Sequence, residues 1–323
     1  MKIYLLTFSD ITKGTRLKFV PKLTRIFIDT IPDHDKFIGE INNKKTTIIF
    51  GLHIEKLSQK DIELVKYYSN SLNNVHTIYN NISNIDIIYD KYICSERLSK
   101  TCKYLQIPEY KLINNEKDLN SIEFPYLLMS NKSSGGDNIF YCKDTKDATE
   151  YYKILLQNMK KNINNKFENN KYFDKIICKK FIESKYKDYN ISIRLYILND
   201  ILLDIRPRPS SNSIIHVFSQ VKDKKVLQDC HNEIAFWFKN NDKYVKNVLK
   251  EIYQLLGDGF YCCDLLLNND KLYLCEFEYK YYETTTEKFL TNNNLYFKER
   301  LESKKFHINF VKQYFRKLAK FKP

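Results

Sequence analysis

The sequence contains little glycine and little proline, with seven residues of each among 323. Long flexible linkers are rich in such residues, so their scarcity argues against linkers of this kind. No apolar run reaches the roughly 18 residues that a membrane-spanning helix needs. Residues 1–8 lead directly into a strand-like pattern without the features of a signal peptide. We therefore expect a cytoplasmic protein without a membrane partner.

The eight cysteines form no CxxC pair, which is the spacing typical of zinc sites and redox motifs. They are scattered singly, apart from the adjacent Cys262 and Cys263. We predict that they are buried free thiols and that the chain has neither a zinc site nor a disulfide framework.

Acidic residues are outnumbered: 39 Asp and Glu stand against 53 Lys and Arg, which gives a formal net charge of +14. A positive field attracts anionic partners. The lysines are spread along the chain with no compact arginine-rich arm, so we do not expect nucleic acid to be the main partner. An anionic small molecule or an acidic peptide fits this charge, although a solvated lysine surface alone would give the same composition.

The length exceeds that of one small core and fits two or three packed lobes. Strand-like and helix-like segments alternate, which is typical of an α/β chain. We predict three units, at residues 1–88, 89–174 and 175–323. In the first, strands 3–8 and 46–50 accompany a helix over 58–70 that begins at Ser58, with Asp61 three residues later.

The second and third units are expected to contain further elements at defined places. Ser95 is expected to cap a helix that Pro108 ends, and Asn199–Asp200 is a two-residue hairpin signal. The other expected elements are strands 124–129, 139–142, 175–182, 190–198, 201–206, 260–267 and 271–278, and helices 148–159, 242–256 and 306–319.

Three carboxylates gather in the last hairpin. A three-residue turn at 268–270 is expected to place Asp264 opposite Leu274 and diagonal to Glu276, with Leu274, Glu276 and Glu278 on one face. Carboxylates so close together repel one another unless a cation neutralises them. Hard oxygen ligands suit Mg²⁺ held jointly with phosphates. A solvent-facing acidic strand is the alternative.

The run 133–138 contains the only glycine pair, Gly135 and Gly136. Small residues let backbone N–H groups approach phosphate oxygens. The run matches neither the GxxxxGK[ST] nor the GxGxxG pattern, and an ordinary hairpin turn is the alternative.

Arginines mark a second candidate site. Arg194 lies in a strand that is otherwise apolar at alternate positions, and Arg206 and Arg208 flank Pro207. The planar guanidinium group suits phosphate or carboxylate. Structural salt bridges to Asp204 or Glu183 are the alternative.

In this order, over roughly residues 90–290, these segments resemble the ATP-grasp superfamily. The paired metal-binding strands of that family are the most specific point of similarity. The resemblance rests on Asp90-Lys91, on 124–129 followed by 133–138, on 176–182, on Ser192-Ile193-Arg194, on Cys263-Asp264 and on Cys275-Glu276-Phe277-Glu278.

The resemblance implies an α/β (α+β) ATP-grasp fold of three lobes, with ATP and Mg²⁺ between the central and C-terminal lobes. The implied metal ligands are Asp264, Glu276 and Glu278. The implied catalytic residues are Arg194, Arg206 and Arg208. The implied nucleotide-binding residues are Lys91, Lys132, Ser134, Gly135, Gly136, Lys179, Lys180, Phe181 and Ile182.

The chain departs from the family pattern at three positions. Glu278 stands where the family usually has Asn, and Met129 stands where it usually has Lys, although Lys132 follows closely. Lys179 stands where an acidic or amide side chain is usual. These departures place the chain at the edge of the family.

Three functions are compatible with the resemblance. The first is a carboxylate–amine ligase that works through an acyl phosphate on an acidic substrate. The second is an inositol-phosphate kinase, because residues 208–212 are similar to the Arg-Pro-Ser run followed by Asn in that group. The third is a non-catalytic ATP-binding protein with a protein partner, as in a clade that includes a translation-initiation-factor assembly protein.

Overall fold

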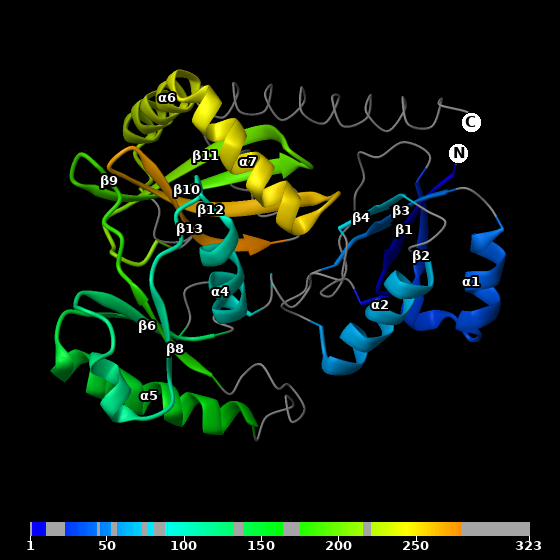
Figure 1. Ribbon diagram of the computed structural model, residues 1–323, viewed down its shortest axis with the longest axis horizontal. Helices are drawn as coiled ribbons and strands as arrows, with labels where there is room; N and C mark the ends of the chain where they lie inside the picture. Colours follow the sequence, from blue (N-terminus) through cyan, green and yellow to red (C-terminus); the bar gives the residue numbers. More distant parts are fainter. Residues whose placement is uncertain are drawn as a thin grey trace.

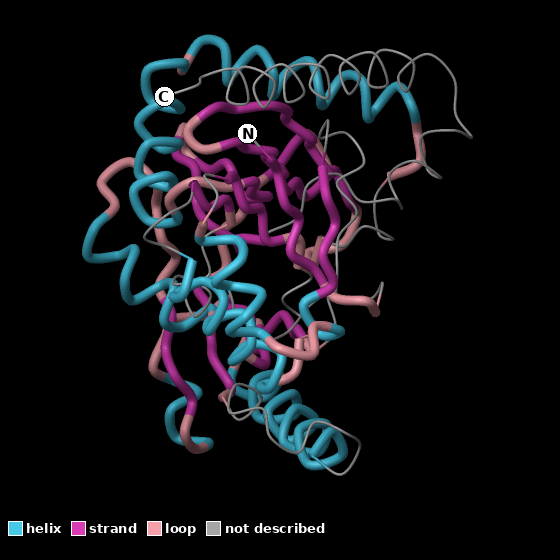
Figure 2. Tube along the Cα trace, turned by 90° about the vertical axis from the view of Figure 1, so that its right-hand side faces the viewer, coloured by secondary structure: helices cyan, strands magenta, loops and turns pink. Residues whose placement is uncertain are grey.

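The computed structural model describes residues 2–10, 23–43, 46–52, 57–72, 77–80, 88, 90–131, 138–163, 175–215 and 221–278. Three sheets make up this part of the chain (Figure 1). Figure 2 shows the same arrangement from the side, with strands inside and most helical turns at the periphery.

The N-terminal sheet is parallel, as the alternation of strands and helices predicts. Its order is β2-β1-β3-β4. Asp61 accepts the N–H of Ser58 at 2.8 Å, and Ser58 Oγ accepts the N–H of Asp61 at 3.2 Å, which confirms the predicted helix start. The elements are β1 (Lys2–Thr7), β2 (Leu23–Phe27), η1 (Ile28–Thr30), α1 (His34–Asn42), β3 (Thr46–Phe50), α2 (Gln59–Leu72) and β4 (Thr77–Tyr79).

The central sheet is antiparallel and has the order β5-β8-β6-β7. Helix α5 packs on one face of it (lower left in Figure 1). Strand β8, expected at the start of the third unit, pairs here with β5 and β6; the division into three units stays a prediction. The elements are α4 (Lys91–Thr101), β5 (Tyr110–Ile113), η4 (Glu116–Asn120), β6 (Tyr126–Ser130), β7 (Ile139–Cys142), α5 (Thr145–Ile163) and β8 (Ile176–Lys180).

The helix predicted to start at Ser95 begins earlier. Asp90 caps α4, because its Oδ1 accepts the N–H of Ile93 at 2.8 Å, and Ser95 lies buried inside the helix. The helix also ends well before Pro108. Residues 103–105 donate their N–H groups to the carboxylate of Glu251 on helix α7 (Asp242–Leu256), which fixes this segment as a loop.

The C-terminal sheet has the order β11-β10-β12-β13, and β9 also pairs with β10. Both expected hairpins form, and the helix expected at 242–256 is α7. Helix α6 was not predicted, and the helix expected at 306–319 lies outside the described residues. The elements are β9 (Lys185–Tyr186), β10 (Tyr189–Leu198), β11 (Ile201–Ser210), α6 (Lys224–Asn240), α7 (Asp242–Leu256), β12 (Phe260–Asn268) and β13 (Lys271–Glu278).

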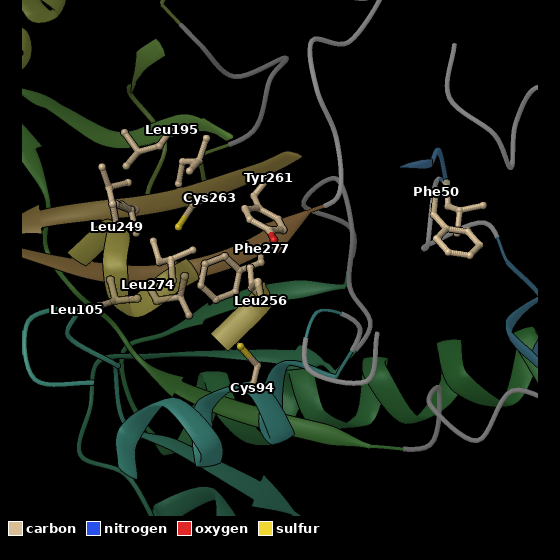
Figure 3. Close-up of a cluster of buried hydrophobic side chains, with 14 of the residues drawn as sticks. Phe50, Cys94, Leu105, Leu195, Leu249, Leu256, Tyr261, Cys263, Leu274 and Phe277 are labelled. Atoms are coloured by element: carbon tan, nitrogen blue, oxygen red, sulfur yellow. The ribbon is translucent and has the colours of Figure 1, made fainter. Parts of the chain in front are cut away.

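The main hydrophobic core joins the N-terminal and C-terminal sheets to helices α4, α6 and α7. Figure 3 shows Leu195 and Cys263, from β10 and β12, gathered with Leu249 and Leu256 of α7. Cys94 of α4 belongs to the same cluster. One face of the C-terminal sheet is therefore fully committed to packing.

All eight cysteines are free, as predicted. Most are buried, and Cys102 and Cys275 are half-buried. Burial raises the pKa of Cys94 to about 12. Raised pKa values of this kind disfavour thiolate chemistry.

Asn80 joins the N-terminal sheet to the C-terminal sheet. Its side chain donates to the carbonyl of Phe50 and accepts the N–H of Phe260, both at 2.7 Å, and its own N–H donates to the carbonyl of Asp258 at 2.8 Å. Its φ of 59° lies in the left-handed region, which Asn tolerates better than most residues. A buried side chain with this set of hydrogen bonds fixes the position of one sheet relative to the other.

We expect Asn80→Ala to lower the free energy of unfolding by about 3 kcal/mol, because two buried backbone groups lose their partners. Urea unfolding measures the loss. Asn80→Gly is the matched control, since glycine tolerates the positive φ and isolates the side-chain contribution. A loss below about 0.5 kcal/mol in both variants would contradict the assigned role.

Candidate active site

The C-terminal sheet has one charged face. Arg194 on β10 lies opposite Arg206 on β11 and Asp264 on β12. Asp264 in turn lies opposite Glu276 on β13. Directly opposed residues point to the same side of a sheet, so these four side chains share a face. The intervening residues are buried in the core on the other side: Ile193, Leu195, Cys263 and Leu265.

A β-bulge in β13 brings Glu276 to the charged face. Asp264 pairs with Glu276 and Leu265 pairs with Leu274, so Cys275 is an extra residue between the two pairs. Leu274 is buried in the core, whereas the Glu276 side chain is 32% exposed. The prediction that Leu274 and Glu276 share a face was therefore wrong.

The expected turn was also wrong. Asn268 pairs with Lys271, so the turn has two residues, Asn269 and Asp270, with φ values of 47° and 57°. Two left-handed residues are typical of the tight type I′ hairpin turn. The shorter turn and the bulge together place Asp264 directly opposite Glu276 and not diagonal to it.

Asp264 is held between two arginines. Arg194 Nε lies 2.8 Å from Asp264 Oδ1, and Arg194 Nη2 lies 2.9 Å from Oδ2. Arg208 Nη2 lies 2.5 Å from the same Oδ2. All three residues are buried. Burial alone would raise the pKa of Asp264, but Arg194 and Arg208 outweigh it and hold this pKa below its ordinary value.

Arg208 has a second partner that the sequence did not suggest. Its Nε donates to Ser192 Oγ at 3.1 Å, across the β10–β11 pair. Ser192 belongs to the Ser-Ile-Arg run that carries the resemblance, yet nothing in the sequence indicated this contact. Of the residues named as alternative partners for the arginines, Glu183 pairs with Lys185 at 2.6 Å, and Arg194 pairs with Asp264.

Two lysines approach Glu276 from other elements. Lys91 Nζ, at the start of α4, lies 3.9 Å from Glu276 Oε2. Lys179 Nζ, on β8, donates to the carbonyls of Leu274 and Cys275 at 3.2 Å and 3.4 Å. Burial acts to lower the pKa of Lys179, but the neighbouring groups, Cys275 first, raise it above its ordinary value.

The central sheet meets this site with a mostly apolar face, on which some side chains are buried and others half-buried. In register, Lys179 lies beside Leu127 and Tyr110, and Ile177 lies beside Met129. Met129 occupies this face, where the resemblance leads one to expect a lysine. The face comprises Tyr110, Leu112, Leu127, Met129, Ile139, Tyr141, Ile177 and Lys179.

Three of the residues expected to bind nucleotide lie at or beyond the end of β8. Lys180 Nζ contacts the carbonyl and Oε2 of Glu123 at 3.0 Å and 3.1 Å. The Phe181 ring packs edge-on against Tyr141, with centroids 4.8 Å apart. Ile182 follows, half-buried. Lys132, Ser134, Gly135 and Gly136 lie outside the described residues.

The proposed metal ligands are only partly described. Asp264 and Glu276 lie opposite each other, and the backbone of Glu278 pairs with Cys262, but the Glu278 side chain lies outside the described part. Among the described residues, no group of three or more His, Cys, Asp or Glu side chains is placed to hold a metal ion. The magnesium site stays a prediction.

The chain is similar to known proteins in its structure. No protein-family model and no curated protein matches the sequence.

Within the described residues, no helix is long and apolar enough to cross a membrane.

Three similar structures, all of low sequence identity, illustrate the structural match. The D-alanine–D-alanine ligase of Bacillus anthracis has a TM-score of 0.55 at 13% identity and covers 99% of each chain. A RimK domain ATP-grasp protein from Sphaerobacter thermophilus has a TM-score of 0.53 at 10% identity, covering 89% of this chain and 94% of its own. The biotin carboxylase domain of the Hydrogenobacter thermophilus 2-oxoglutarate carboxylase has a TM-score of 0.52 at 12% identity, covering 96% and 64%. The chain therefore has the ATP-grasp fold that its sequence predicts.

Proposed function

We propose that this chain binds ATP and uses it to activate a carboxylate of an anionic small molecule or acidic peptide for ligation to an amine. The observation that carries the proposal is the buried Arg194–Asp264–Arg208 cluster beside Glu276 and Lys91. Arginine forks held rigidly in a buried site suit phosphate and carboxylate oxygens. The site therefore offers positioned cations where a phosphoryl group would be transferred.

The two facing surfaces divide the nucleotide between them. The apolar face of the central sheet, with Leu127 and Tyr141, suits the base, and the charged face of the C-terminal sheet suits the phosphates. A D-alanine–D-alanine ligase with this fold, at a TM-score of 0.52 and 13% identity, is complexed with ATP. That complex supports ATP as the nucleotide here.

The proposed reaction has two steps. A substrate carboxylate oxygen bonds to the γ-phosphorus of ATP while the bond from that phosphorus to the β-bridging oxygen breaks, which releases ADP and leaves an acyl phosphate. The amine nitrogen then attacks the acyl carbon, phosphate leaves with the C–O electron pair, and the nitrogen loses a proton. Arg194 and Arg208 stabilise the negative charge that develops on the oxygens. No protein nucleophile is required.

Magnesium fits the donor set in chemistry, because Asp264 and Glu276 are hard oxygen ligands on directly paired strands. In this arrangement both Asp264 oxygens accept guanidinium hydrogen bonds, so a cation competes with Arg194 and Arg208 for them. Bound there with Glu276, and with Glu278 as the resemblance implies, it would neutralise phosphate charge.

A kinase acting on inositol phosphates is the second candidate. One observation favours it: the register of β9, β10 and β11 puts Lys185, Arg206 and Arg208 on the same face. A polyanionic acceptor would suit this row of cations. The Lys185 contact with Glu183, at 2.6 Å, reduces the charge available at its end of the row.

The test begins with isothermal titration using a non-hydrolysable ATP analogue, with and without Mg²⁺. Turnover is then assayed with ATP, hydroxylamine and a panel of dicarboxylates, amino acids and acidic peptides, because hydroxylamine traps acyl phosphates as hydroxamates. Hydroxamate formation supports the ligase, whereas phosphorylation of an inositol phosphate supports the kinase. Binding without any turnover indicates a non-catalytic role, and absence of binding overturns the proposal.

A further inference from the structure

Lys179 is a buried lysine that reaches from one sheet into another. It lies on β8 of the central sheet, is 4% exposed, and its ammonium group contacts the carbonyls of Leu274 and Cys275 on β13. The same ammonium lies 5.4 Å from the centre of the Tyr110 ring. Both contacted carbonyls belong to the bulge that changes the face of β13. The ammonium group is therefore surrounded by the β13 carbonyls on one side and by the Tyr110 ring on the other.

The bulge explains why a hydrogen-bond donor is placed here. An extra residue interrupts the ladder between two strands, so backbone groups beside it lack their usual partners. A buried carbonyl without a hydrogen bond is costly. Lys179 donates to the carbonyls of Leu274 and of Cys275 itself, and a charged donor strengthens such bonds.

The bulge in turn determines where Glu276 points. Without the extra residue, strict alternation would put Glu276 on the same side as Leu274, which is buried in the core. With it, Glu276 lies opposite Asp264 and 3.9 Å from Lys91. Whatever stabilises the bulge therefore stabilises Glu276 on the charged face.

We propose that Lys179 is a positioning residue: it fastens the bulge of β13 and so holds Glu276 in the site, rather than binding the nucleotide directly. The placement of Glu276 follows from the geometry, whereas its part in the reaction rests on the proposed function. This assignment differs from the nucleotide-binding role that the resemblance implies for Lys179.

A double-mutant cycle tests the proposal through nucleotide affinity. Lys179→Met keeps the length of the side chain but removes the charge, and it is combined with Glu276→Gln. Isothermal titration with ADP and Mg²⁺ should show an affinity loss of about tenfold for Lys179→Met alone and little further loss in the Glu276→Gln background. Equal losses in both backgrounds would overturn the proposal, because Lys179 would then act independently of Glu276.

A second readout needs no nucleotide. Loosening the bulge should expose the backbone N–H groups of β13 to solvent. Amide hydrogen exchange, followed by peptide mass spectrometry, should show the peptide that covers residues 272–277 exchanging about tenfold faster in Lys179→Met, with the peptide of α6 unchanged as the internal reference. Unchanged exchange at the bulge would overturn the proposal even if the chain binds no nucleotide, and faster exchange would support it in that case.

Lys111→Met is the matched control. Lys111 lies on the neighbouring strand β5 and forms an exposed ion pair with Glu109, with Nζ and Oε1 3.7 Å apart. We expect neither ADP affinity nor hydrogen exchange at the bulge to change in this variant. A similar effect in Lys111→Met would show that loss of positive charge, and not loss of the bulge contact, is responsible.

Discussion

Asp264→Asn is expected to abolish nucleotide-dependent turnover and to lower the free energy of unfolding by about 3 kcal/mol. The carboxylate accepts from Arg194 and Arg208 in a buried site, so its neutralisation leaves two buried guanidinium groups without their shared counter-charge. Asparagine keeps the shape and one acceptor oxygen, which isolates the effect of charge. Urea unfolding and a turnover assay on the same preparation measure both effects.

The control for Asp264→Asn is Asp242→Asn. Asp242 pairs with Lys246 at 2.6 Å, but both side chains are more than half exposed, so this pair should contribute less than about 1 kcal/mol. If Asp264→Asn retained wild-type turnover, the metal and catalytic assignments of this carboxylate would both fail. If it unfolded no more easily than Asp242→Asn, the buried cluster would have no role in stability.

The Asp264 contribution should also depend on pH. Its pKa in the folded chain is lowered, so its stabilisation is complete above the unfolded pKa of about 3.9 and is lost as the pH falls below that value. The stability difference between wild type and Asp264→Asn should therefore be constant from about pH 5 upward and shrink below about pH 4. Unfolding curves at a series of pH values measure it, and a difference that grew on acidification would contradict the arginine pairing.

The sequence predicted charged positions on single strands of the C-terminal sheet, because strand alternation is a local property, but their meeting on one face comes from the strand pairing. Arg194 and Asp264 stand in runs of alternating apolar residues, and a period of two assigns each to one side. The helix over 242–256 was predicted for a similar reason: its apolar residues recur with helical spacing. Patterns of this kind are contained in short windows of sequence.

The sequence could not predict the bulge or the contacts that depend on it. Whether an extra residue is accommodated in β13 depends on its pairing with β12 and on the edge contacts of Gln106, whose N–H and carbonyl bond to Leu272 and Leu274. Lys179 was predicted to contact the nucleotide because the resemblance implies it, whereas its partners in the structure are backbone carbonyls, which any residue supplies. Such acceptors leave no trace in the sequence.

The error at the start of α4 has a different origin. Asp90 and Ser95 are both good N-cap residues, and the cap was assigned to the second of them. The helical pattern of Leu98, Cys102 and Leu105 then pointed to a helix that continued beyond residue 101. Glu251, distant in sequence, accepts the backbone N–H groups of residues 103–105, so these groups are not available for a longer helix.

Arg194→Ala is expected to reduce turnover by about 100-fold or more while the affinity for an ATP analogue changes far less. The reason is that a guanidinium aimed at the transferred phosphoryl or acyl phosphate oxygens is most valuable when charge develops on them. Arg194→Lys keeps a positive charge but loses the fork that contacts both oxygens of Asp264. We therefore expect the lysine variant to recover only part of the lost turnover.

The Arg194 variants separate catalysis from folding when stability is measured alongside kcat and nucleotide affinity. Arg97→Ala, on the exposed side of α4, is the control and should leave all three unchanged. Since Asp264 loses one of its two arginine partners in Arg194→Ala, some destabilisation is expected, and assays must be made where the variant is folded. Equal losses in turnover and affinity would make Arg194 a nucleotide-binding residue, whereas unchanged turnover would remove it from the active site. A loss confined to kcat would support a role for its guanidinium at the reacting phosphate, on the face that Arg194 shares with Asp264 and Glu276.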